Sequence, residues 1–167
     1  FDTIKLGDKW IFTAGGRVDR FDIDYDYANL STAAANPTLP VGTLLPRANL
    51  GLRDTVANGK LSALYKPTET SSVYALLATS KAPPGTNLSL STSANSSANP
   101  RYEPQESTTA EVGAKLDLLK QKLSLTAAVY RTTVKNEVEQ DPVDLQYYQT
   151  GKKQVQGVEL GVTGAIT

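Results

Sequence analysis

The chain has no histidine, no cysteine and no methionine among its 167 residues. It therefore lacks the commonest general base and the usual zinc, haem and thiolate ligands, so we predict no metal site and no cofactor. Without cysteine it forms no disulfide, and cysteine usage does not indicate a redox compartment. Carboxylates are plentiful, but no spacing fixes a catalytic pair of the glycosidase kind. We therefore do not expect an enzyme.

An excess of charge of one sign and long apolar runs are also missing. The 17 basic residues balance the 17 acidic ones, so we expect no nucleic acid as a partner. No run approaches the roughly 18 apolar residues of a transmembrane helix. A membrane β-barrel remains possible, because its strands are individually weak signals. The chain begins at Phe1, already within a strand-like stretch, so we expect an internal piece of a longer protein.

The stretch Gln154–Ile166 alternates between apolar and polar residues. Successive side chains of a strand point to opposite faces of the sheet. One face would hold Val158, Leu160, Val162, Gly164 and Ile166, and the other Gly157, Glu159, Gly161, Thr163 and Ala165. A soluble sheet with one wet face has this pattern, and so does a barrel strand with lipid outside and water or a plug inside.

Similar patterns predict seven strands, at about 1–6, 10–27, 56–66, 72–79, 107–118, 122–137 and 153–166. In the second strand the apolar parity changes at Phe21, which a bulge or a strand leaving its first environment would produce. In the fourth, both parities are apolar, so its faces are not assigned.

The connections between these strands alternate in length. Turns near residues 8, 69 and 121 are short, whereas loops 28–55, 80–106 and 138–152 are long, and all prolines fall in turns or loops. Outer-membrane barrels have short periplasmic turns and long outer loops, while loops of this length are uncommon in a compact soluble domain. We predict an all-β fold, an antiparallel up-and-down transmembrane β-barrel.

Two alternatives stay open from the pattern alone. A self-contained soluble β-sandwich, acting as a binding or adhesion module, would also have one uncharged face. A small passive outer-membrane pore is disfavoured by the odd strand count, because single-chain bacterial barrels have an even number of strands.

Several segments, in the same order, resemble the TonB-dependent outer-membrane receptors, specifically the branch that binds ferric-catecholate siderophores. They are Trp10–Asp19, Leu64–Pro67, Ser72–Ala75, Tyr102–Lys115, Leu123–Arg131 and Gln154–Leu160. In Tyr102–Lys115 the similarity lies in a Pro-Gln pair followed by Glu-x-Gly-x-Lys. Ala110 departs from the pattern, because the family more often has an aromatic residue there.

The resemblance implies a 22-stranded barrel filled by an N-terminal plug domain. Residues 1–167 would supply a seven-strand segment of the β-barrel domain, with the plug and the remaining strands absent. The implied function is receptor-mediated transport of ferric-catecholate siderophores, driven through TonB acting on the plug. The implied location is the bacterial outer membrane, with lipid around the barrel.

A ferric catecholate is a bulky anion with aromatic rings, so its site should offer cations and aromatic faces. Arg101 and Tyr102 form the best pair, because they join a cation and a ring at the start of a strand. The same residue types would also fit solvated loops or an aromatic girdle at the membrane interface. The ligand-binding candidates at the long-loop end are Arg47, Arg53, Lys81, Arg101, Tyr102, Tyr147 and Tyr148.

A second set of charged residues is predicted to face the barrel lumen, because each lies opposite the apolar parity of its strand. They would line the transport route or hold the plug, or else form a ladder of cross-strand ion pairs on a wet face. The lumen-facing candidates are Arg17, Asp19, Glu111, Lys115, Asp117 and Glu159.

Overall fold

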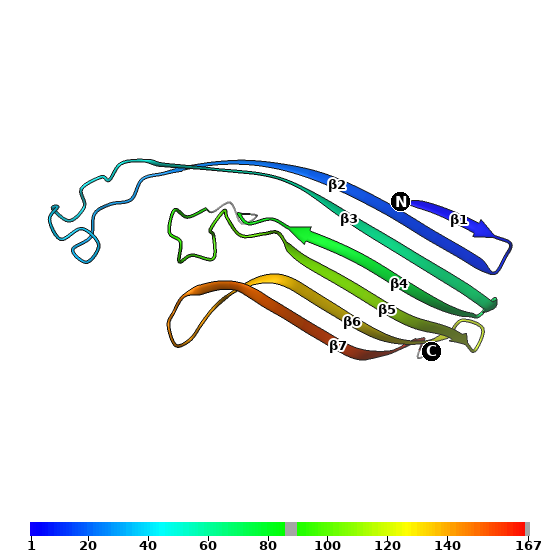
Figure 1. The fold of residues 1–167 in the computed structure, drawn as a ribbon. Helices are drawn as coiled ribbons and strands as arrows, with labels where there is room; N and C mark the ends of the chain where they lie inside the picture. Colours follow the sequence, from blue (N-terminus) through cyan, green and yellow to red (C-terminus); the bar gives the residue numbers. More distant parts are fainter. Residues whose placement is uncertain (86–89, 166–167) are drawn as a thin grey trace.

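The computed structural model describes residues 1–85 and 90–165, which form one antiparallel sheet of seven strands (Figure 1). The strands follow the chain order from one edge of the sheet to the other. They are β1 (Asp2–Leu6), β2 (Trp10–Tyr27), β3 (Ala48–Thr68), β4 (Ser71–Ala82), β5 (Gln105–Leu118), β6 (Leu123–Gln140) and β7 (Tyr147–Gly164). None of the described residues belongs to a helix that could cross a membrane.

The connections lie at two opposite ends of the sheet, as an up-and-down topology requires. The short turns 7–9, 69–70 and 119–122 share one end, and connections 28–47, 83–104 and 141–146 share the other (Figure 1). The predicted all-β antiparallel up-and-down arrangement and the count of seven strands are confirmed.

Several predicted strand limits were wrong: β3, β6 and β7 were predicted too short, and the loops beside them too long. β3 begins at Ala48 and pairs with β2 as far as Tyr27, β6 reaches Gln140, and β7 begins at Tyr147. The third connection is therefore a short loop, 141–146, because both strands continue beyond their apolar stretches. Polar residues there hid the strands from a pattern based on alternation. β7 ends at Gly164, and Ile166 lies outside the described residues.

The parity change at Phe21 is not a bulge. β2 and β3 stay in register without interruption from Trp10↔Tyr65 to Tyr27↔Ala48. The second half of this hairpin instead enters a different environment, where its apolar side chains face connection 83–104. Gly85 lies between the side chains of Leu90 and Ile23, and Val56 and Leu90 are each 3% exposed.

One face of the sheet has a continuous band of exposed apolar side chains, which we name the apolar belt. It includes Ile4, Leu6, Trp10, Phe12, Leu61, Val73, Leu77, Val112, Leu116, Val129, Val158, Leu160 and Val162, joined by the cross-strand register. β4 thus places Val73 and Leu77 on the belt and Tyr74 and Leu76 on the opposite, polar face.

The height of the belt matches that of a lipid-facing band. On β5 it runs from Leu118 to Ala110, or about 27 Å along the strand, and a tilt of about 40° reduces this to about 21 Å across a bilayer. At the short-turn end the Trp10 ring stacks on Phe12 and lies tilted against Tyr65, with ring centroids 5.6 and 4.5 Å apart. Aromatic girdles of this kind mark membrane interfaces.

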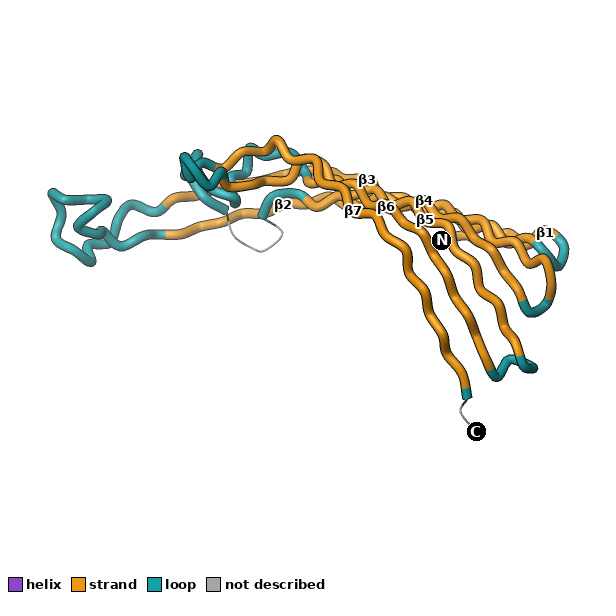
Figure 2. The backbone as a smooth tube through the Cα atoms, turned by 90° about the horizontal axis from the view of Figure 1, so that it is seen from below, coloured by secondary structure: helices purple, strands orange, loops and turns teal. Residues whose placement is uncertain are grey.

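The sheet is a single curved layer (Figure 2). Among the described residues, Val56, Pro83 and Leu90 are the only buried apolar side chains. A β-sandwich packs two sheets face to face and buries an apolar layer between them. The soluble sandwich is therefore not supported, and the apolar belt requires a surrounding apolar medium.

Candidate functional site on the polar face and at the long-loop end

The residues predicted to face the lumen share one face of the sheet. Strand register places Arg17, Asp19, Glu111, Lys115, Asp117 and Glu159 on the polar face, opposite the apolar belt. Their ion pairs run along single strands, with Arg17 Nε 2.6 Å from Asp19 Oδ1 and Lys115 Nζ 3.2 Å from Asp117 Oδ2. Arg17 and Lys115 therefore do not form the cross-strand ladder of ion pairs.

Two tyrosines on the polar face cover glycines of the neighbouring strand. Tyr74 is paired with Gly113, and a Cβ built on Gly113 would lie 2.5 Å from the Tyr74 ring. The Tyr74 hydroxyl donates a hydrogen bond to Glu111. Tyr130 covers Gly157 in the same way, with its hydroxyl oxygen 2.8 Å from the position of a Cβ. The glycines in β5 and β7 thus make room for the rings.

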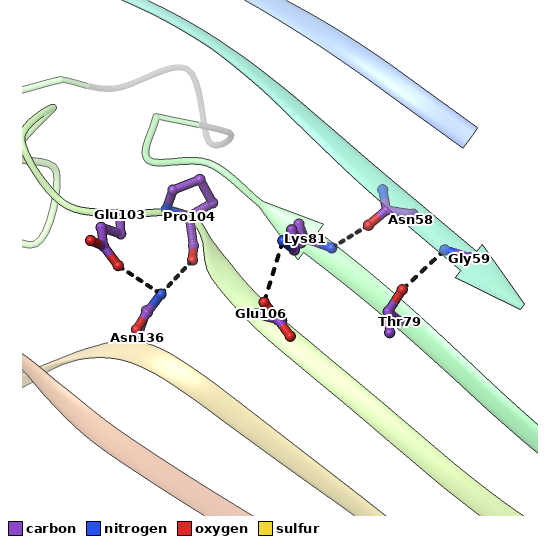
Figure 3. Close-up of polar contacts among 8 residues, drawn as sticks. All are labelled: Asn58, Gly59, Thr79, Lys81, Glu103, Pro104, Glu106 and Asn136. Atoms are coloured by element: carbon purple, nitrogen blue, oxygen red, sulfur yellow. Dashed lines mark hydrogen bonds and ion pairs between the residues drawn. The ribbon is translucent and has the colours of Figure 1, made fainter. Parts of the chain in front are cut away.

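Two ligand-binding candidates lie on the same side as the apolar belt, above it. Arg53 Nε is 3.0 Å from Asp22 Oδ2 across the β2–β3 pair, and Lys81 Nζ is 3.4 Å from Glu106 Oε2 across the β4–β5 pair (Figure 3). Both side chains therefore point away from the polar face and are engaged by carboxylates.

Tyr102 and Tyr147, in contrast, are brought together. The Tyr102 hydroxyl donates to the Tyr147 carbonyl at 3.1 Å. Asn95 strengthens this contact, because its side-chain oxygen accepts from the Tyr147 amide at 2.7 Å and its Nδ2 donates to the Leu145 carbonyl at 3.1 Å. Connection 83–104 is thereby attached to the β6–β7 hairpin. Its other side reaches β2, where the Tyr27 and Thr92 hydroxyls are 2.7 Å apart.

A polar cluster that the sequence did not reveal fixes the start of β5. Asn136 has φ of 57° at a register shift between β6 and β7, and its Nδ2 donates to Glu103 Oε2 and to the Pro104 carbonyl, each at 3.2 Å (Figure 3). Gln149 Nε2 donates to the carbonyls of Glu103 and Asn136. Asn adopts positive φ more readily than most residues, and this preference is the one sequence feature that could have indicated the role of Asn136.

The remaining candidates are exposed at the long-loop end. Arg47 directly precedes β3, and Arg101 projects from connection 83–104, where its amide donates to Asn99 Oδ1 at 2.9 Å. Tyr148 donates its hydroxyl to Asp144 Oδ2 at 2.6 Å. This hydrogen bond lowers the pKa of Asp144 and raises the pKa of Tyr148, because it favours the carboxylate and the protonated phenol.

Removal of the Asn95 side chain should release connection 83–104 from the β6–β7 hairpin. Asn95→Ala deletes two hydrogen bonds, worth about 1–3 kcal/mol in total. We expect faster hydrogen exchange at the Tyr147 amide in the full-length protein. Asn95→Asp keeps the acceptor for that amide and should have a smaller effect. The control Asn49→Ala removes a comparable contact, to Asp26, from the β2–β3 hairpin. Equal exchange at Tyr147 in wild type and Asn95→Ala would contradict the attachment.

Neither the surface hollows nor the metal-ligating side chains of the described residues identify a functional site elsewhere. One hollow is lined mainly by belt residues, among them Phe12, Leu61, Leu77, Val112 and Val129, so it belongs to the apolar face. A smaller one lies on the polar face beside Tyr74 and contains one charged residue, Lys60. Within residues 1–85 and 90–165 no group of three or more acidic or other metal-ligating side chains comes together.

Comparison with known proteins gives the same picture over the full length of the chain. The family model described as "TonB dependent receptor-like, beta-barrel" matches residues 1–167. The catecholate siderophore receptor Fiu of Escherichia coli K12 is 37% identical over 100% of this chain, and the probable TonB-dependent siderophore receptor PiuA of Acinetobacter baumannii is 32% identical over 99%. The chain spans only 23% and 21% of these two proteins.

Solved structures of the same two receptors match in three dimensions. The closed form of Fiu from E. coli K12 superposes with a TM-score of 0.84 at 35% identity, covering 100% of this chain and 25% of that one. PiuA superposes with a TM-score of 0.75 at 32% identity, covering 99% of this chain and 22% of that one. The matched proteins are named as receptors, which agrees with the expectation that this chain is not part of an enzyme. The chain belongs to the TonB-dependent receptor family and is part of its outer-membrane β-barrel.

Proposed function

We propose that this chain is part of the wall of a receptor that takes up ferric-catecholate siderophores. The observation that supports this most is the whole-chain similarity to Fiu, a catecholate siderophore receptor, in both sequence and structure. The proposal includes a closed barrel, because the seven strands here leave two open edges, which cannot face lipid. The family resemblance implies about 22 strands in all. It also includes a plug domain through which TonB supplies the energy.

In this proposal the polar face lines the barrel interior. The charged residues Arg17, Asp19, Glu111, Lys115, Asp117 and Glu159 would then contact the plug or the water around it. Lipid would surround the apolar belt, where every exposed side chain is uncharged between Leu118 and Ala110 on β5.

The proposed ligand contacts are Arg101 with Tyr102 and Tyr147 beside it. An exposed guanidinium next to a half-buried ring offers charge pairing and stacking to an anionic catecholate. Arg47 and Tyr148 are at the same end of the sheet and remain proposed contacts. Arg53 and Lys81 are weaker candidates, because carboxylates hold them on the outward face.

Arg101→Gln should weaken the binding of the ferric complex of 2,3-dihydroxybenzoate to the full-length receptor. Loss of one charge-assisted contact at about 1.5 kcal/mol corresponds to a roughly tenfold higher Kd. Arg53→Gln is the matched control and should change Kd by less than about twofold, because Asp22 holds the Arg53 side chain on the outward face. Binding measured by tryptophan fluorescence quenching tests this without TonB. Equal effects of the two substitutions would contradict the proposed contact.

A further inference from the structure

A row of charged residues crosses four strands on the outward face, just beyond the apolar belt. Register aligns Lys81 with Glu106, Glu106 with Lys135, and Lys135 with Lys152. Lys81 and Glu106 form an ion pair (Figure 3). Lys135 and Lys152 are directly opposite each other, an arrangement that destabilises a sheet through repulsion of like charges. In the described part of the chain neither lysine has an ion-pair partner.

The β6–β7 hairpin also contains carboxylates, but they form ion pairs with a lysine on the opposite, polar face. Lys153, the neighbour of Lys152, lies 2.9 Å from Glu137 and 2.6 Å from Glu139, and these contacts raise the pKa of its ammonium. Within β6 and β7, the lysines without an ion-pair partner, Lys135 and Lys152, are thus on the outward face.

The position of this charged row relative to the apolar belt indicates which layer of the membrane its side chains contact. Arg131 is aligned with Ala110 in the last row of the belt and donates to Gln156 at 3.4 Å. Lys135 is four residues further along β6, or about 14 Å along the strand and about 10 Å along the membrane normal. Headgroup layers are roughly 5–8 Å thick, and lysine side chains extend several ångströms towards charge. The cations therefore lie at headgroup level.

We propose that this surface, formed by Arg131, Lys135 and Lys152, binds the phosphate groups of lipids in the outer leaflet. Side chains of this parity point away from the barrel interior, so neither the plug nor a transported solute reaches them. A phosphate between Lys135 and Lys152 removes their repulsion by pairing with both. Thr108 and Thr133 lie between the two cationic levels and offer hydroxyl donors to the same group. The inference depends on the outward orientation of the belt and not on which siderophore is transported.

Lys135→Gln together with Lys152→Gln should weaken the binding of diphosphorylated lipid A to the full-length receptor in neutral detergent. At about 1 kcal/mol for each cation, the loss is about 30-fold, and it should shrink at high salt. The control, Lys5→Gln with Lys60→Gln, removes the same charge from the opposite face. It should change the affinity by less than about twofold. Equal affinities of the wild type and the outward-face variant would overturn the proposal.

Two further measurements distinguish lipid binding from capture of free phosphate and from a purely structural role of the two lysines. Inorganic phosphate at matched concentration should not displace the lipid, since the acyl chains lie on the belt; full displacement would assign the site to free phosphate instead. Without lipid, the outward-face variant should unfold at the same temperature as the wild type or above it, because the like-charge pair is gone. With lipid A present the order should reverse. A variant less stable in both conditions would show that the lysines serve the fold and not a lipid.

Discussion

Val158→Arg is expected to lower the stability of the assembled barrel by about 1–3 kcal/mol, a value between the cost of a cation at the edge and at the middle of a lipid-facing band. Val158 is 68% exposed and lies in the row of the belt that also contains Phe12, Val112 and Val129. The belt-face neighbours of Val158 on β6 and β7, Val129, Arg131, Gln156 and Leu160, include no carboxylate that could pair with the new charge. The folded fraction of the full-length receptor, measured across a urea series in lipid vesicles, reports this loss.

The same strand provides a control of the same residue type. Val155 is 58% exposed and is paired with Thr132 on the polar face. Val155→Arg should cost much less than Val158→Arg, because an interior-facing cation keeps its water. Similar losses from both substitutions would show that the two faces have been assigned the wrong way round or that neither meets lipid.

Gly113→Ala should destabilise the barrel by about 1–3 kcal/mol, the usual range for overpacking. The new methyl group would lie 2.5 Å from the ring of Tyr74, so the ring must move and its hydrogen bond to Glu111 is lost. Gly157→Ala is the matched comparison and should cost less. There the nearest atom is the Tyr130 hydroxyl oxygen, at 2.8 Å, at the far end of the side chain.

A double-mutant cycle in the urea series tests the cause. Tyr74→Ala removes the ring that the methyl group displaces, so Gly113→Ala should cost little in that background. We expect a coupling energy of about 0.5–3 kcal/mol in favour of the double variant. Additive losses would mean that Gly113 is needed for its backbone and not for the space it leaves.

The sequence predicted the fold where strands alternate within the belt. Val112 and Glu111, or Val158 and Glu159, differ so sharply in polarity that parity alone assigns their faces. It failed where β3, β6 and β7 continue beyond the belt. Around Arg53 the alternation continues with its faces exchanged, because Leu50 and Leu52 lie on the face opposite the belt, and a pattern that expected one constant apolar face did not recognise the strand.

The candidate site was less predictable than the fold. Arg101 and Tyr102 are adjacent in sequence, so their proximity needed no structure. The contacts of Tyr102 with Tyr147 and of Asn95 with Leu145 join positions far apart in the chain, and no local pattern indicates them. Arg53 and Lys81 were chosen for charge, but the face on which each lies depends on strand limits that the sequence did not resolve.

The topology described above also has a kinetic meaning. Every pair of contacting strands is consecutive in the chain, so the wall can form one hairpin at a time. Closing the 20-residue connection 28–47 costs about 1 kcal/mol more in chain entropy than closing the six residues 141–146, a factor of about six in rate. The β2–β3 hairpin should therefore close after β6–β7. Because the entropic cost of loop closure grows only with the logarithm of loop length, doubling the length of connection 28–47 adds only about 0.6 kcal/mol. The outermost loop can therefore diversify in length during evolution without endangering the wall that supports it.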